Sequence, residues 1–188
     1  MLTYYNKGGG LIKPTETFNL LVTLQGQKDE NSGAEVIGTE EIELALKGYE
    51  KVLNIKESNF PNVLLIDLAM EPLDAVKLIG NAPTTVISKV VLIEKVVRTR
   101  VDSILEKVID LAGDRVVSGD TFRVICDLRG RKYIKSKEEL VERISDELIE
   151  RFNLKSNSSD LDWIVQIEVV GENTGISMLN PEMILKKI

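Results

Sequence analysis

The chain has 188 residues, of which 43% are hydrophobic and 29% charged, and its formal net charge is -6. This length allows one sizeable domain or two small ones, and the composition is ordinary for a soluble globular protein. No run of about 18 apolar residues is present, so we expect no membrane-spanning helix. The N-terminus also lacks the basic start and apolar core of a secretory signal.

Residue types that commonly carry catalysis are scarce. The chain contains no histidine and one cysteine. Histidine is the commonest general base and metal ligand, so its absence lowers the expectation of an enzyme and of a metal site, although catalysis by carboxylates remains possible in principle. A single cysteine cannot form an internal disulfide, which fits a cytoplasmic protein in a reducing environment.

The first part of the chain combines a polar N-terminal segment with alternating strands and helices. Residues 1–17 are rich in glycine and polar residues, so we expect a flexible arm. The predicted strands are 18–24, 62–69 and 85–97, and the predicted helices are 39–54 and 71–80. The helix at 39–54 is expected to bury Ile42, Leu44, Ala45, Tyr49, Val52 and Leu53. This order is most of a ferredoxin-like unit, which makes residues 18–85 a first α/β domain.

The second part, residues 86–188, is predicted to form another α/β domain. Helices are expected at 99–114 and at 136–152, where Ser136 and Glu139 form a capping box. The strands are expected at 122–129, 163–171 and 174–179, with a last strand or short helix after them. One face of the strand at 122–129 contains Phe122, Val124, Cys126 and Leu128, and the other contains Arg123, Ile125, Asp127 and Arg129. Because Cys126 lies on the apolar face, we expect a core residue and not a nucleophile.

Charge is distributed unevenly between the two parts. Residues 1–85 contain 7 lysines and 12 acidic residues, whereas residues 86–188 contain 17 basic and 18 acidic residues, including every arginine. The planar guanidinium of arginine suits bidentate contacts with phosphate. The asymmetry therefore suggests two parts with different roles, in which the acidic first part could dock a basic partner.

The densest group of cations lies between residues 123 and 137, where six basic residues accompany one acid, Asp127. The group covers a strand end, a loop and a helix start, and helix N-termini attract phosphate. Gly130 would let the backbone turn and approach a ligand closely. The candidate RNA-binding residues are Arg129, Gly130, Arg131, Lys132, Lys135, Ser136 and Lys137, followed by Arg123, Arg143, Arg98 and Arg100. The sequence leaves open the alternative that these cations pair with acids of the helix at 136–152.

Two stretches resemble the THUMP domain, an RNA-binding module of tRNA-modifying systems. They are SGDTFRVICDLRGRKYIKSKEELVERISDELIERF at 118–152 and SSDLDWIVQIEVVGENTGISML at 158–179. The matching positions are Phe122, Val124, Arg129, Gly130, Ser136, Glu168, Gly171, Gly175, Ile176 and Ser177. The earlier segments FNLLVTL, FPNVLLIDL, EPLDAVKLI and VVLIEKVVRT resemble the stand-alone branch of this family, which assists RNA cytidine acetyltransferase.

This resemblance implies a THUMP domain at 86–188 and a protein that binds tRNA. It further implies an adaptor that presents tRNA to a separate RNA cytidine acetyltransferase for N4-acetylcytidine formation. We would then expect no catalytic activity, no cofactor, no membrane contact and no small-molecule substrate. Two alternatives stay open: a protein-interaction module without RNA binding, and a tRNA-modifying enzyme in its own right.

Overall fold

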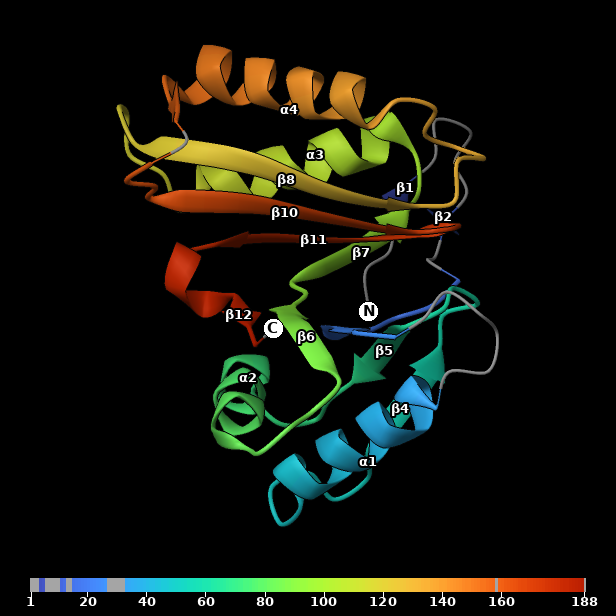
Figure 1. Cartoon of the computed structure of the whole chain (residues 1–188). Coiled ribbons are helices and arrows are strands. Elements are labelled where there is room, and N and C mark those ends of the chain that lie inside the picture. Colours follow the sequence, from blue (N-terminus) through green and yellow to red (C-terminus); the bar gives the residue numbers. More distant parts are fainter. Residues whose placement is uncertain (1–3, 6–10, 13–14, 27–32, 158, 188) are drawn as a thin grey trace. The chain divides into compact units, whose positions relative to one another are not determined.

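The computed structural model describes residues 4–5, 11–12, 15–26, 33–157 and 159–187, and these form two compact units (Figure 1). The N-terminal unit comprises residues 18–93 and 182–188. The C-terminal unit comprises residues 94–181 together with the first 17. Among the described residues, no helix combines the length and the apolar character needed to cross a membrane.

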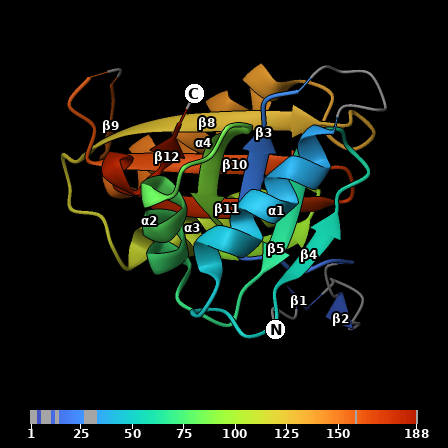
Figure 2. The same ribbon diagram turned by 60° about the horizontal axis from the view of Figure 1, so that its bottom comes forward.

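The N-terminal unit is a five-stranded antiparallel sheet with two helices on one face (Figure 2). Its elements are β3 (Leu20–Leu24), α1 (Ala34–Leu46), β4 (Asn54–Glu57), β5 (Val63–Asp67), α2 (Pro72–Asn81), β6 (Ile87–Leu92) and β12 (Leu185–Lys186). The strand order is β12-β6-β3-β5-β4, and every neighbouring pair is antiparallel. Without β12 this is the βαββαβ arrangement of a ferredoxin-like fold, which confirms the expected fold class.

Helix α1 begins and ends earlier than the sequence predicts. It spans Ala34–Leu46, and the chain then turns at Gly48, whose φ of +87° disfavours any residue with a side chain. Asn54, the predicted last residue of the helix, is instead the first residue of the edge strand β4, which spans residues 54–57. The helix buries Ala34, Gly38, Ile42 and Leu46 at four-residue spacing. Gly38 permits this packing because a Cβ atom there would come within 2.7 Å of the Leu24 side chain.

The apolar face predicted for this helix is therefore wrong in part. Ile42 is buried, whereas Leu44, Tyr49 and Val52 are 72%, 64% and 77% exposed. Tyr49 and Val52 are exposed because the helix ends before them, whereas Leu44 lies within the helix on the side away from the buried row that contains Ile42.

The chain passes between the two units inside the segment predicted as one long strand. That segment forms β6 and then β7 (Lys95–Arg98), which belong to different sheets. The units therefore divide after Ile93, and not at residue 86. Glu94 follows the break, and its carboxylate accepts hydrogen bonds from Arg115 Nη1 at 2.8 Å and Nη2 at 2.5 Å. Because the carboxylate also accepts from the Met178 N–H at 2.8 Å, Glu94 joins β11 (Asn173–Leu179) to the chain after helix α3 (Val101–Gly113).

The arm predicted at residues 1–17 lies mostly outside the described residues. Its described parts include β1 (Tyr4–Tyr5) and β2 (Leu11–Ile12), which pair antiparallel. The N–H groups of Thr15 and Glu16 donate to Asn173 Oδ1 at 3.1 and 3.3 Å, so this end of the arm is fixed to the C-terminal unit.

The C-terminal unit is a mixed sheet with α3 and α4 side by side on one face (Figure 1). Its main elements are β7, α3 (Val101–Gly113), β8 (Thr121–Arg129), α4 (Lys137–Phe152), β9 (Lys155–Ser156), β10 (Trp163–Val170) and β11 (Asn173–Leu179). The strand order is β7-β11-β10-β8-β9. Strand β8 runs parallel to β10 and to β9, and the remaining pairs are antiparallel. Helix α4 covers β8, and α3 covers β11.

The core of this unit forms between the helices and the sheet. Phe122, Val124 and Cys126 of β8 face the helices and are at most 9% exposed, as their alternation predicts. From α4, Leu140 and Ile144 pack into the same cluster. Cys126 is 3% exposed, which confirms its expected place in the core.

Burial raises the pKa of the Cys126 thiol to about 12, and the nearby carboxylate of Asp127 adds to this shift. An unfolded cysteine ionises near ~8.5, so the unfolded chain loses this proton at lower pH than the folded protein does. The thiol's contribution to stability is therefore complete below about pH 8.5, and it is lost as the pH rises toward 12. We expect the native protein to resist Ellman's reagent at pH 8 and to yield one reactive thiol in urea. Rapid stoichiometric labelling of the native protein would contradict this burial.

Candidate nucleic-acid interface

The predicted cations begin at the end of β8, where the strand pairs with the centre of the sheet. The parallel register sets Arg129 opposite Val170, and Val170 in turn pairs with Asn173 of β11. Asn173 pairs with Arg98 of β7. Arg129 and Arg98 therefore lie in one row across four strands, about 14 Å apart at the usual strand spacing.

Arg129 is held on the face of the sheet opposite the helices. Its Nη1 donates to Glu168 Oε2 at 2.6 Å, and the two side chains are 15% and 0% exposed. Gln166 Nε2 donates to the other Glu168 oxygen at 2.9 Å. Of the predicted phosphate contacts, Arg129 thus has its charge engaged inside the protein, since a buried carboxylate needs a cationic partner.

The loop after Arg129 turns at Gly130, whose φ is +84°. This left-handed conformation favours glycine because it has no Cβ. The Gly171 N–H donates to the Arg129 carbonyl at 2.9 Å, so the β10–β11 turn fixes the start of the loop. Ile134, in the middle of the loop, is 2% exposed and anchors it to the core.

The loop ends at Ser136, the N-cap of α4. Its Oγ accepts a hydrogen bond from the Glu139 N–H at 3.2 Å, as the predicted capping box requires. The cap occupies one of the four N–H groups that a helix start leaves without an intrahelical partner. The positive end of the helix dipole lies here, beside the exposed cations of the loop.

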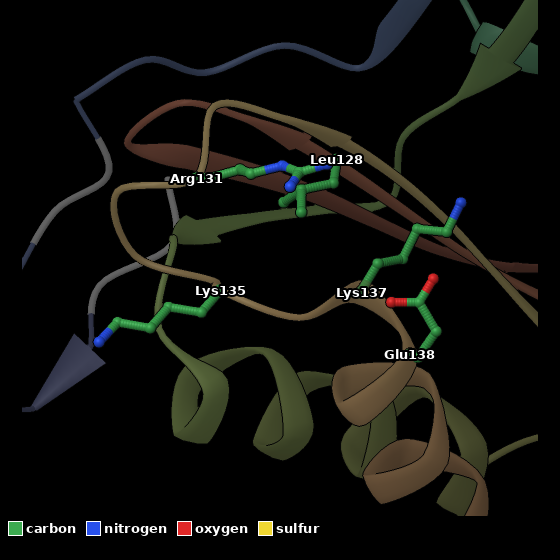
Figure 3. Close-up of a pocket in the computed structure, with 5 residues that line it drawn as sticks. All are labelled: Leu128, Arg131, Lys135, Lys137 and Glu138. Atoms are coloured by element: carbon green, nitrogen blue, oxygen red, sulfur yellow. The ribbon is translucent and has the colours of Figure 1, made fainter.

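Three cations and Glu138 surround a hollow of about 200 Å³ at this helix start, together with Leu128. Figure 3 shows that Arg131 extends along Leu128, whereas Lys135 and Lys137 point in other directions. Arg131, Lys135 and Lys137 are all exposed, and among the described residues none of them forms an ion pair. Diverging, unpaired cations suit a series of phosphates better than a single one, because each can meet a different group.

Lys132 and Tyr133 form the exposed tip of the loop. The Lys132 Nζ atom lies 5.3 Å from the centre of the Tyr133 ring, within the range of a cation–π contact. Tyr133 is 42% exposed, and its hydroxyl donates to Glu172 Oε1 at 3.3 Å. Sequence reasoning missed this tyrosine, although an aromatic residue among cations is a pattern typical of base stacking.

The second set of candidates is divided in space. Arg98, at the end of β7, and the exposed Arg100, which precedes α3, lie at the same end of the sheet as the loop. Arg123 lies toward the opposite end of β8 and lines a second hollow of about 410 Å³ along the strand, which shares Lys137 and Glu138 with the first. Arg143 lies within α4, 3.7 Å from Asp102, in an exposed pair of the kind that contributes little. The structure thus gathers Arg98, Arg100 and the loop, but not Arg123 or Arg143.

Four elements meet at this end of the sheet: β7, β8, the loop at 130–136 and the start of α4. Their cations form a basic surface of the kind that contacts nucleic-acid backbones. Residues 98–179 match the family model described as the THUMP domain. The C-terminal unit therefore contains a THUMP domain, which follows an N-terminal α/β region.

Solved structures with the same fold span both units of this chain. PH1313 from Pyrococcus horikoshii superposes with a TM-score of 0.67 at 13% identity, over 90% of this chain and 55% of that one. A 4-thiouridine synthetase, solved in complex with RNA and ATP, gives 0.61 at 12% identity, over 90% and 42%. TrmN from Thermus thermophilus gives 0.53 at 15% identity, over 85% and 44%. This chain thus spans about half the length of the solved chains that it matches. No curated protein matches the sequence.

The Arg129–Glu168 pair makes a testable contribution to stability. Replacing Arg129 by methionine removes the guanidinium that neutralises a buried carboxylate, and we expect a loss of ~3–5 kcal/mol in the free energy of unfolding. The double variant Arg129→Met/Glu168→Gln should recover more than half of this loss, because the carboxylate charge is then gone. Urea denaturation measures both. A single-variant cost under ~1 kcal/mol would mean that the pair behaves like an exposed one.

Proposed function

We propose that this protein binds tRNA through backbone phosphates at the basic end of its THUMP domain. It presents the tRNA to a separate RNA cytidine acetyltransferase, which forms N4-acetylcytidine, and it carries out no chemistry itself. The observation that carries this proposal is the group of exposed, unpaired cations, Arg131, Lys135 and Lys137, around the start of α4.

The physical case rests on backbone recognition. An RNA duplex offers side chains few base edges in its deep major groove, so proteins recognise it largely through shape, phosphates and 2′-hydroxyls. The basic end offers cations on three elements: the loop at 130–136, the start of α4 and the end of β7. The 4-thiouridine synthetase named above was solved with RNA, which supports the same ligand class for this chain.

The partner enzyme follows from the resemblance of the N-terminal segments to the stand-alone THUMP branch. The chemistry of the chain supports a helper role in the cytoplasm. It has no histidine, and its one cysteine is buried with a raised pKa.

The phosphate proposal predicts that charge reversal at the hollow weakens tRNA binding. For Arg131→Glu/Lys135→Glu/Lys137→Glu we expect a loss of about tenfold or more in affinity, similar for unrelated tRNA sequences. The slope of log affinity against log salt should become shallower by roughly one for each phosphate that the variant no longer neutralises. The fold should survive, since these side chains are exposed and an acidic residue is favourable in a first helical turn.

The matched control is Lys51→Glu/Lys77→Glu/Lys186→Glu, which changes the net charge equally at exposed lysines of the N-terminal unit. It should bind tRNA nearly as wild type does. Equal losses of tRNA affinity in both variants would mean that the change in net charge accounts for the weaker binding. Unchanged binding in the hollow variant would favour the alternative of a protein-interaction module without direct RNA contact.

The helper role predicts no activity from the isolated protein. Purified protein with acetyl-CoA and tRNA should yield no N4-acetylcytidine when the digested tRNA is analysed by mass spectrometry. With the acetyltransferase added, the yield should rise above that of the enzyme alone. Product formed by this protein alone would show it to be an enzyme and would overturn the proposal.

A further inference from the structure

Exposed apolar side chains concentrate on one side of α1. Val36, Ile37 and Leu44 are 65%, 43% and 72% exposed. Positions 36, 40 and 44 follow one another along a helix surface, so Val36, Glu40 and Leu44 form a row, with Ile37 beside Leu44. We call Val36, Ile37, Glu40, Glu43 and Leu44 the outer face of α1. Apolar groups left together in water on one face are typical of an interaction site.

The charge of this helix has one sign. Helix α1 contains four glutamates and no basic residue. Two of them serve the fold: Glu35 accepts from the Asn62 N–H at 3.0 Å, and Glu41 accepts from the Thr85 N–H at 2.8 Å. Glu40 and Glu43 differ, because both are exposed and neither has a hydrogen-bond or ion-pair partner among the described residues. They lie among the apolar side chains of the outer face.

The exposed apolar side chains and the unpaired glutamates of the outer face together indicate the kind of partner that it binds. Unpaired carboxylates repel RNA and anionic lipid surfaces, which excludes both as ligands of this face. Two copies of the helix would bring the same glutamates together, so pairing between copies is disfavoured. A protein surface that is basic and partly apolar meets both features of the outer face, because its cations match the glutamates while its apolar groups cover Val36 and Leu44.

We propose that the outer face of α1 is the docking surface for a basic, partly apolar face of the acetyltransferase. This inference rests on the proposed function, and it assigns the two partners to different units. The tRNA binds the basic end of the C-terminal unit, and the enzyme binds the acidic helix of the N-terminal unit.

The test compares two identical substitutions at equally exposed valines. Val36→Lys changes the outer face, and Val117→Lys changes the C-terminal unit, where Val117 is 67% exposed. Binding of each full-length variant to the purified RNA cytidine acetyltransferase of the same organism is measured by isothermal titration calorimetry. Sedimentation velocity follows self-association, and tRNA affinity is measured in parallel. We expect Val36→Lys to weaken enzyme binding about tenfold or more, while Val117→Lys binds as wild type does and both variants bind tRNA alike.

Other outcomes separate the two proposals. Equal enzyme binding by both valine variants, or equal losses, would overturn the outer face as the docking site and leave the tRNA proposal standing. A dimer that Val36→Lys abolishes would overturn it in favour of a second copy as the occupant. No binding of the wild-type protein to the enzyme would overturn this inference and also the partner in the proposed function. The tRNA affinity of Arg131→Glu/Lys135→Glu/Lys137→Glu tests the tRNA-binding part of the proposed function independently.

Discussion

The parallel pairing of β8 with β10 decides where the cations of the C-terminal unit lie. It sets Arg129 beside the buried Glu168, two residues before the end of β10, and it brings the Gly171 N–H to the Arg129 carbonyl. The loop therefore leaves the sheet in one direction, through a glycine with positive φ. Its other end is fixed by the Ser136 cap. Between these two fixed points only Ile134 is buried, so the basic side chains are left in solvent.

This arrangement explains how an acidic protein can keep a basic surface. The cation nearest the sheet, Arg129, neutralises a buried carboxylate, while those farther along the loop stay unpaired among the described residues. The acids of the N-terminal unit lie on other elements than the basic loop, and α1 alone contains four of them. Net charge consequently says little about the ligand here, because the potential near a surface depends on local groups over about a Debye length of 8–10 Å.

Local patterns in the sequence predicted the elements whose signals are self-contained. The capping box at Ser136 indicated α4, and the alternation of β8 indicated the buried Cys126 and the place of Arg129 on the opposite face of the strand. The prediction failed where contacts between residues distant in the sequence determine the structure. Strand β4 is short and half exposed, so it carries no apolar pattern, and α1 is placed by the fit of Gly38 to Leu24. The pairing of Arg129 with Glu168 depends on strand register, which links residues 39 positions apart and leaves no trace in local spacing.

Hydrogen–deuterium exchange of the protein with and without tRNA would locate the RNA-binding surface, since it reads every segment in one experiment. We expect slower exchange in peptides that cover residues 130–139 when tRNA is bound, and no change in peptides that cover α1. Protection confined to the N-terminal unit, or none around the start of α4, would contradict a phosphate-binding role for the basic loop.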